Sequence, residues 1–127
     1  MSSIEDRIQE IGQQYAHLIQ DVLVLSLTDE TFRLILALND GSTLRVTERW
    51  QNRSLIRYSY YWLDTGNQLK TGWDNSPHHD HLDNFPHHKH VGKQAIMLPS
   101  YETSLDAVMD IITEDMTLQN QDANIEM

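Results

Sequence analysis

The central part of the chain is a succession of short β-forming segments separated by turn signals. Asp40-Gly41 lies between two apolar segments and is a typical hairpin sequence, and Asp64-Thr-Gly-Asn67 forms a second turn signal. In residues 43–50 apolar and polar residues alternate, which is typical of a strand with one buried face. The five expected strands are residues 21–28, 31–38, 43–50, 54–64 and 68–74. Because tight turns join antiparallel neighbours, the pattern predicts an antiparallel meander.

Helical periodicity appears only near the two ends of the chain. Ser2 and Glu5 have the spacing of a capping box, and an apolar stripe predicts a helix over residues 3–19. That stripe consists of Ile4, Ile8, Ile11, Tyr15 and Leu18. A short edge strand is expected at residues 95–98, and residues 100–104 can cap a second helix. The apolar positions of the second helix are Leu105, Val108, Met109, Ile112 and Met116. The predicted fold class is α+β, an antiparallel meander sheet of about five to six strands flanked by an N-terminal and a C-terminal helix.

Size and composition bound the remaining possibilities. A chain of 127 residues suits one domain, which we expect to span residues 1–117, followed by a flexible acidic tail at 118–127. There is no cysteine, which excludes disulfides and thiolate metal sites. No apolar run is long enough for a membrane span, and the acidic start does not resemble a signal peptide. We therefore expect a soluble, cytoplasmic protein with no membrane partner.

The net charge of −10 is unevenly distributed along the sequence. Residues 1–42 carry a net charge of −5 and residues 94–127 carry −7, whereas residues 43–93 carry +2. Six of the seven histidines also lie in this central part, within residues 78–90. An acidic protein repels polymeric anions over long distances, but a local basic, His-rich centre can hold a phosphate or a short anionic ligand.

The His-rich segment lies in residues 75–93, where apolar periodicity is absent and a long loop is expected. It contains two Pro-His-His units, which begin at Pro77 and Pro86 and lie nine residues apart. Proline restricts its own backbone and biases the preceding residue toward extended structure. Each unit therefore places a histidine pair on a stiffened backbone, which suits a preorganised site.

Three interpretations of the His-rich segment fit this pattern. The first is a mobile His-rich surface loop without chemistry. The second is a zinc or nickel site, although the HExxH and cysteine patterns of familiar sites are absent. Its ligands would come from His78, His79, Asp80, His81, His88 and His90. The third is general acid–base catalysis, because histidine both takes and gives a proton near neutral pH.

Acid–base catalysis is the chemistry that we expect. RNA is cleaved by its own 2′-hydroxyl when a base removes the 2′ proton, an acid protonates the leaving 5′ oxygen and a cation stabilises the phosphorane. Two histidines with Lys89, Lys70 or Arg57 supply these groups, with no metal and no other cofactor. We therefore predict a metal-independent ribonuclease-type phosphodiesterase. The alternatives are a metal-dependent nuclease built on the His cluster and a non-enzymatic interaction module that docks through the acidic ends of the chain.

Three stretches together closely resemble the TumE-like toxin family of prokaryotic toxin–antitoxin modules. They are Tyr58-x-Tyr60, Trp73-Asp-Asn-Ser-Pro-His-His and Phe-Pro-His-His-Lys-His90, within a similarity that runs from about Leu44 to Ile112. The resemblance implies a small α+β protein with a ribonuclease-like toxic activity and a helix-turn-helix antitoxin as partner. Related small proteins accompany type III CRISPR systems, which implies ring-nuclease cleavage of cyclic oligoadenylate in antiviral defence as a second setting. One departure is Gly72, where the family often has a basic residue.

The expected site residues combine this chemistry with the motif. Those that match the family motif are Asp74, Asn75, His78, His79, His88 and His90. The expected catalytic residues are Asp74, His78, His79, His88 and His90. The expected substrate-binding residues are Arg57, Tyr58, Tyr60, Lys70, Trp73, Asn75, His87 and Lys89. The aromatic members offer surfaces for base stacking, with the sheet core as their alternative place. Side chains two apart on an extended segment share a face, so His88 and His90 should act together and His81 should tolerate substitution.

Charge and surface also bear on the partners. A net charge of −10 opposes the binding of long RNA, whereas a short cyclic oligoadenylate needs only the basic centre. We therefore expect cyclic oligoadenylate as a substrate almost as strongly as RNA. An exposed edge strand and apolar helix faces predict a homodimer, since two-fold pairing is the commonest assembly.

Overall fold

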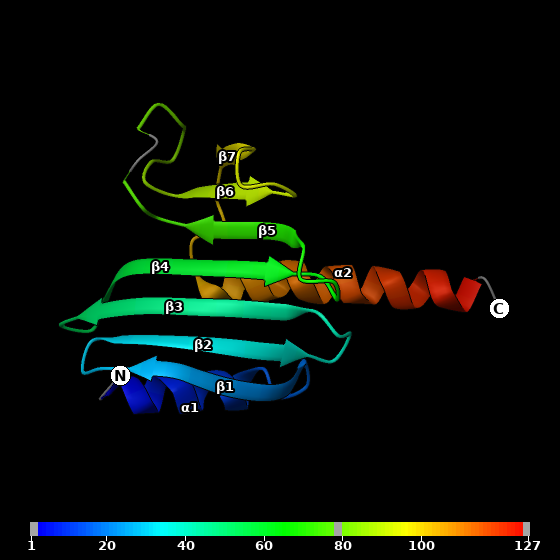
Figure 1. Ribbon diagram of the computed structural model, residues 1–127, viewed down its shortest axis with the longest axis horizontal. Helices are drawn as coiled ribbons and strands as arrows, with labels where there is room; N and C mark the ends of the chain where they lie inside the picture. Colours follow the sequence, from blue (N-terminus) through cyan, green and yellow to red (C-terminus); the bar gives the residue numbers. More distant parts are fainter. Residues whose placement is uncertain (1–2, 78–79, 126–127) are drawn as a thin grey trace.

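The computed structural model describes the backbone of residues 3–77 and 80–125 and shows one antiparallel sheet with a helix near each end of the chain (Figure 1). The seven strands of this described part follow one another in the sheet in sequence order, so the sheet is a simple meander. The elements are α1 (Ile4–Gln14), β1 (Ile19–Leu27), β2 (Thr31–Leu38), β3 (Thr43–Gln51), β4 (Ser54–Leu63), β5 (Leu69–Asp74), β6 (His88–Val91), β7 (Met97–Pro99) and α2 (Leu105–Ile125). The predicted α+β class is confirmed. None of the helices in these ranges combines the length and apolar composition needed to cross a membrane.

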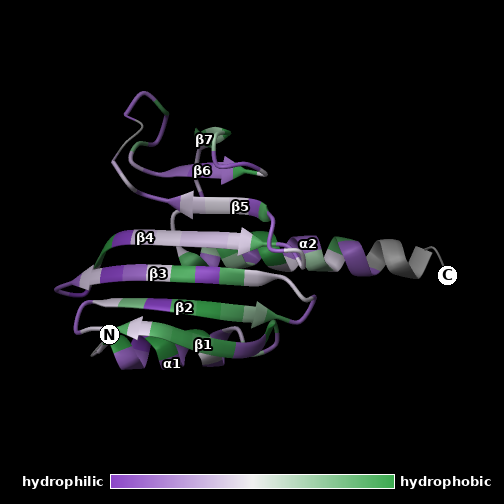
Figure 2. Ribbon diagram, viewed as in Figure 1, coloured by the Kyte–Doolittle hydropathy of each residue, from purple (hydrophilic) through white to green (hydrophobic). Residues whose placement is uncertain are grey.

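The sheet has one strand more than the upper expected number. The additional strand is β6, which lies inside the segment 75–93 that the sequence indicated as a loop. It pairs with β5 on one side and with β7 on the other. Its sequence, His-Lys-His-Val, has no apolar alternation, because both of its buried side chains are imidazoles. Figure 2 shows this strand as largely hydrophilic, in contrast to the edge strand β1.

Both helices differ in length from the expectation. α1 ends at Gln14 instead of extending to residue 19, although Tyr15 and Leu18 continue its buried stripe through the turn that follows. The cap is Ser3 rather than Ser2, and its hydroxyl oxygen accepts a hydrogen bond from the backbone N–H of Asp6 at 3.0 Å. α2 is capped by Ser104 and continues through residues 118–125, which the sequence indicated as a tail. Its C-terminal part projects beyond the strands in Figure 1.

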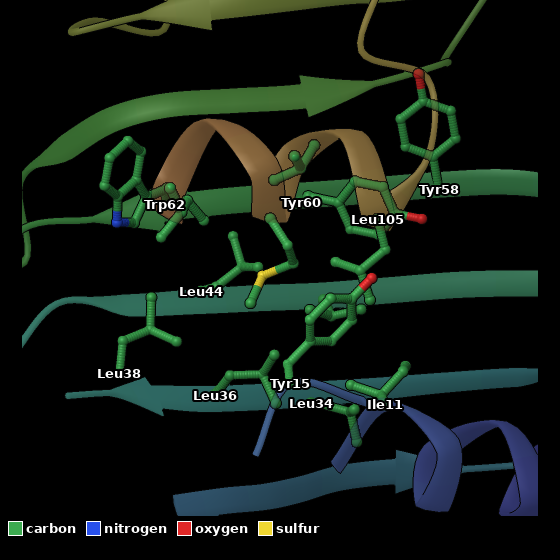
Figure 3. Packing of buried hydrophobic residues seen from close by; sticks show 14 of the residues in the cluster. Ile11, Tyr15, Leu34, Leu36, Leu38, Leu44, Tyr58, Tyr60, Trp62 and Leu105 are labelled. Carbon is green, nitrogen blue, oxygen red and sulfur yellow. The ribbon is translucent and has the colours of Figure 1, made fainter. Parts of the chain in front are cut away.

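One face of the sheet forms the core together with both helices (Figure 3). The alternation expected for β3 and β4 is confirmed, because Leu44 and Val46 are buried on the same side as the aromatic side chains of β4. The core side chains are Ile11 of α1, Phe32, Leu34, Leu36 and Leu38 of β2, Tyr58, Tyr60 and Trp62 of β4, Trp73 of β5, and Leu105, Val108, Met109 and Ile112 of α2. We call the opposite side of the sheet the open face. Its side chains on β2 and β3 are mixed, with Arg33, Arg45 and Thr47 beside the apolar Ile35 and Ala37.

The core contains one charged network, which connects α1 to the sheet. The carboxylate of Glu48 is fully buried and accepts hydrogen bonds from Nε and Nη2 of Arg7 at 3.0 and 3.1 Å. The indole N–H of Trp50 donates to it at 2.9 Å and the hydroxyl of Tyr60 at 2.6 Å. Burial would lower the pKa of Arg7, but the hydrogen bond and charge of Glu48 outweigh this and raise it, so Arg7 remains a cation.

We expect Glu48→Gln to lower the free energy of unfolding by about 3–5 kcal/mol, because it leaves the Arg7 cation in the interior without its counter-charge. Urea unfolding monitored by circular dichroism measures the change. The matched control is Glu30→Gln, since Glu30 contacts Arg49 at only 3.9 Å and both side chains are 54% exposed. The control should change stability by less than about 0.5 kcal/mol. Equal effects of the two substitutions would contradict a structural role for the network.

Candidate active site

The pairing of β5 with β6 assembles a compact cluster on the open face. In this register Asp74 lies opposite His88, and Gly72 lies opposite His90. Alternate residues of a strand share a face, so Asp74, His88 and His90 point to one side of the sheet, while Trp73 and Lys89 point to the helix side. The expectation that His88 and His90 share a face is confirmed. We call Asp74, His88 and His90 the Asp–His–His cluster.

The three side chains of this cluster converge in a nearly dry position. Nε2 of His88 lies 2.9 Å from Oδ1 of Asp74, and Nε2 of His90 lies 3.6 Å from Oδ2. The two imidazole rings are 5.1 Å apart between centroids and nearly perpendicular, at 82°. Asp74 and His90 are each 6% exposed and His88 is 3% exposed. A buried carboxylate is costly unless its charge is compensated, so these contacts stabilise Asp74 in its buried position.

Backbone carbonyl groups orient both imidazoles. Nδ1 of His88 lies 3.1 Å from the carbonyl oxygen of Pro86, and Nδ1 of His90 lies 2.7 Å from that of Gln94. A carbonyl oxygen only accepts hydrogen bonds, so Nδ1 of each ring carries a proton. Each Nε2 that faces Asp74 then has two states. It either carries a second proton, as an imidazolium paired with the carboxylate, or presents a lone pair to a cation.

Two further groups donate hydrogen bonds to the Asp74 carboxylate. The hydroxyl of Tyr61 donates to Oδ2 of Asp74 at 3.1 Å, and the backbone N–H of Ser76 donates to Oδ1 at 3.0 Å. Gln94 in turn donates from Nε2 to the Tyr61 hydroxyl at 3.3 Å. Burial, together with the negative charge of Asp74, raises the pKa of Tyr61. Tyr61 therefore stays protonated and acts as a permanent hydrogen-bond donor to the cluster.

The absence of a side chain at Gly72 makes room for the Tyr61 ring. Gly72 lies between Tyr61 of β4 and His90 of β6 in the register of the sheet. A Cβ atom at this position would overlap Cε1 and Cδ1 of the Tyr61 ring. The absence of a side chain thus lets the ring lie over β5 with its hydroxyl at Asp74. A longer side chain at this position would occupy the space of this ring.

The aromatic residues expected to stack on a substrate base lie in the core instead. Tyr58, Tyr60 and Trp73 are 2%, 0% and 1% exposed, and their rings face α2 rather than the open face. Burial raises the pKa of Tyr58 and of Tyr60, and nearby carboxylates add to the effect. These positions leave no ring surface for a base, so the alternative of a core role is the one that the structure supports.

The two lysines expected to bind phosphate are engaged on the helix side of the sheet. Nζ of Lys89 lies 3.1 Å from Oε1 of Glu102, and Nζ of Lys70 lies 3.2 Å from Oδ2 of Asp115. Lys70 also lies 3.9 Å from the centroid of the Trp62 ring. Burial opposes the ionisation of Glu102, but hydrogen bonds from Lys89 and Trp73 outweigh it and lower the pKa of this carboxyl. Neither lysine faces the Asp–His–His cluster.

Of the other expected residues that the structure describes, some make hydrogen bonds within the fold and one is exposed. Nδ1 of His87 lies 2.8 Å from the Tyr58 hydroxyl, and burial, with the charge of His88, lowers the pKa of His87. The side chain of Asn75 accepts from the backbone N–H of Tyr58 at 2.9 Å and donates to the carbonyl of Ile56 at 3.1 Å, which holds the end of β5 against β4. Arg57 is exposed and lies opposite Arg49 on the open face. His78 and His79 lie outside the described residues.

Tyr61 and Gln94, which the sequence analysis did not select, are direct neighbours of the cluster. They also border a hollow of about 490 Å³ on the open face. The other lining residues are Arg33, Arg45, Thr47, Ser59, Leu63 and Leu69. The alternation of β3 and β4 already placed Arg45 and Tyr61 away from the core. Only the strand register brings them together with Arg33, which precedes the basic part of the sequence.

Comparison with known proteins agrees with the resemblance seen in the motifs. Residues 6–117 match the family model described as Toxin TumE, which includes every strand of the sheet and the whole Asp–His–His cluster. The chain belongs to the TumE toxin family. No curated protein and no solved structure gives a significant match. Membership of TumE supports a toxin role, with an antitoxin as the corresponding partner.

We expect Gly72→Ala to destabilise this TumE-family protein by about 1–3 kcal/mol, because the new methyl group displaces the Tyr61 ring from Asp74. Urea unfolding gives the magnitude. Gly12→Ala is the matched control, since Gly12 lies in α1 with nothing within 4 Å of its added Cβ. The control should stabilise the protein by about 0.5–1 kcal/mol. A Gly72→Ala protein as stable as the wild type would contradict the close approach of the ring.

Proposed function

We propose that this protein is a ribonuclease-type toxin that cleaves RNA phosphodiester bonds with His88 and His90. The carrying observation is the pair of Nε2 atoms that two backbone carbonyls aim at one buried carboxylate. This arrangement supplies two proton-transfer groups in fixed positions, which is what cleavage by the 2′-hydroxyl requires. The family match, which is to a toxin, agrees with a destructive activity on a cellular nucleic acid.

The shorter contact to Asp74 suggests different roles for the two histidines. His88, at 2.9 Å, is the better candidate to hold the extra proton, and His90, at 3.6 Å, the better candidate for the neutral base. His90 would take the proton of the 2′-hydroxyl, and the 2′ oxygen would form its bond to phosphorus. The bond from phosphorus to the 5′ oxygen would break, and His88 would give that oxygen its proton. The products would be a 2′,3′-cyclic phosphate and a free 5′-hydroxyl.

The developing charge on the phosphate requires a cation near the cluster. Lys70 and Lys89 are paired with carboxylates on the other side of the sheet, so the arginines of the open face are the better candidates.

Ribonucleotide phosphodiesters of two kinds fit this chemistry, namely RNA strands in a toxin–antitoxin setting and cyclic oligoadenylate in a CRISPR setting. The proposal also includes a helix-turn-helix antitoxin and a homodimer. The exposed Leu23, Val24 and Leu25 on the edge strand β1 support such pairing.

We expect His88→Ala and His90→Ala each to lower the rate of RNA cleavage by about 10²–10⁴-fold, because each removes one proton-transfer group. A labelled RNA incubated with the purified full chain gives the rates, and circular dichroism verifies folding. His81→Ala is the control and should keep the wild-type rate, since His81 is exposed and outside the cluster. A folded His88→Ala or His90→Ala protein with full turnover would remove that residue from the mechanism.

A second candidate is a metal-dependent nuclease, which one specific observation favours. The ligand atoms of Asp74, His88 and His90 all lie within 4.8 Å of one another. Histidine ligands usually donate their other ring N–H to a carbonyl or carboxylate, as both imidazoles do here. Two imidazoles and one carboxylate suit Zn²⁺ and other transition metals. A metal at this position would activate water, and RNA would not need its 2′-hydroxyl.

Chelation and product analysis separate the two candidates. For acid–base cleavage we expect full activity after EDTA treatment, 2′,3′-cyclic phosphate ends by mass spectrometry, and no cleavage of 2′-deoxy or 2′-methoxy substrates. For metal-dependent cleavage the activity would disappear with EDTA and return with zinc, nickel or manganese. The products would then end in a 5′-phosphate and a free 3′-hydroxyl. The second set of results would overturn the acid–base proposal.

A further inference from the structure

We propose that the hollow on the open face is the binding site for the phosphodiester backbone of a ribonucleotide substrate, held by Arg33 and Arg45. This inference rests on the proposed function, because it supplies the substrate site for the Asp–His–His cluster. The hollow has a volume of about 490 Å³, which lies within the range of about 300–1,000 Å³ typical of ligand pockets. Its residues come from β2, β3, β4 and β5 and from the segment between β6 and β7.

The position of the hollow connects it directly to the cluster. Tyr61 lines the hollow and donates its hydroxyl to Asp74 at 3.1 Å. Gln94 also lines the hollow, and its backbone carbonyl accepts the Nδ1–H of His90 at 2.7 Å. Two walls of the hollow are therefore the same side chains that border the cluster. Tyr61 and Gln94 therefore connect the hollow to the Asp–His–His cluster.

The charge of the hollow is positive in a protein that is acidic as a whole. Arg33 and Arg45 are exposed, and none of the described residues that line the hollow is a carboxylate. Neither arginine has an ion-pair partner among the described residues. By contrast, Arg7, Arg49, Lys70 and Lys89 each contact a carboxylate. The two free guanidinium groups are thus available to an external anion, and arginine is well suited to phosphate because its planar fork donates two parallel hydrogen bonds.

The strand register places these two arginines within reach of one ligand. Arg33 lies opposite Thr47 of β3, and Arg45 is two residues from Thr47 on the same strand and face. Such diagonal neighbours are about 7–8 Å apart, which lets both long side chains reach the same or adjacent phosphates. The hydroxyl groups of Thr47 and Ser59 line the floor between them and Tyr61, and they add hydrogen-bond donors for sugar or phosphate oxygens. The set of donors fits a ribonucleotide backbone better than an apolar ligand.

The test measures binding separately from cleavage. Fluorescence polarisation follows a labelled, uncleavable 2′-methoxy RNA oligonucleotide bound to the full chain, with unlabelled cyclic oligoadenylate as competitor. We expect Arg33→Gln and Arg45→Gln each to raise the Kd by about 10-fold, in line with the loss of a charge-assisted phosphate contact. The double variant should also flatten the dependence of log affinity on log salt by about 0.7 per lost contact.

Arg53→Gln is the matched control. Arg53 is an exposed arginine in the turn between β3 and β4, away from the hollow, and its substitution changes the net charge by the same amount. It should leave the Kd within about twofold, because a distant surface charge is largely screened. Competition by cyclic oligoadenylate at lower concentration than by linear RNA would identify the short ligand as the occupant, and the reverse order would identify the RNA strand.

The outcomes distinguish this site from the proposed function. Cleavage by the wild type together with wild-type binding by the Arg33→Gln/Arg45→Gln variant would overturn the site and leave the ribonuclease proposal intact. Binding that depends on the two arginines, without cleavage by the wild type, would support the site and overturn the ribonuclease proposal. Equal losses of affinity in the double variant and in Arg53→Gln would mean that the affinity depends only on the net charge of the protein, which would overturn the site.

Discussion

The candidate site depends on the pairing of two short strands, β5 and β6. Their register places Asp74 opposite His88 and Gly72 opposite His90, so a shift by one residue would turn both imidazoles toward the helices. Burial of the Asp74 carboxylate then requires compensating groups, which His88, His90, Tyr61 and the Ser76 N–H supply. Gly72 allows one of these groups to reach its place. The chemistry of the site thus follows from one ladder of backbone hydrogen bonds and one buried charge.

The two buried carboxylates on the sheet, Glu48 and Asp74, differ in how their charge is balanced. Arg7 faces Glu48 and remains a cation at any physiological pH, with Trp50 and Tyr60 as additional donors. This arrangement is permanent and suits a structural role. Among the described residues Asp74 has no such partner, and the cationic groups that contact it there are the two imidazoles. A proton on an imidazole, or a metal bound beside it, would supply the positive charge next to Asp74. The charge around Asp74 can therefore change, whereas the charge around Glu48 is fixed.

The fold was largely predictable because turn signals and alternation are local. The Asp40-Gly41 turn and the Leu44/Val46 alternation indicated the meander, and the period of two predicted the shared face of His88 and His90. β6 was not predictable as a strand, because its buried side chains are polar and its pairing is set by distant residues. Distant residues also decide on which side of the sheet each basic side chain lies. Lys70 and Lys89 are engaged with α2 and the segment before it, and Arg33 reaches the open face from an acidic part of the sequence.

The separation of charge between the two sides of the sheet makes a net charge of −10 compatible with the anionic substrate that we propose. α2 carries acidic residues such as Asp110 and Glu114 on the helix side, whereas Arg33 and Arg45 lie on the open face. A helix packed on a sheet lies about one layer, roughly 10 Å, from the opposite surface. The Debye length at physiological salt is about 8 Å, so the acidic helix is largely screened from a ligand in the hollow. The local field is then set by the two arginines, and association should be governed by this face rather than by the charge of the whole chain.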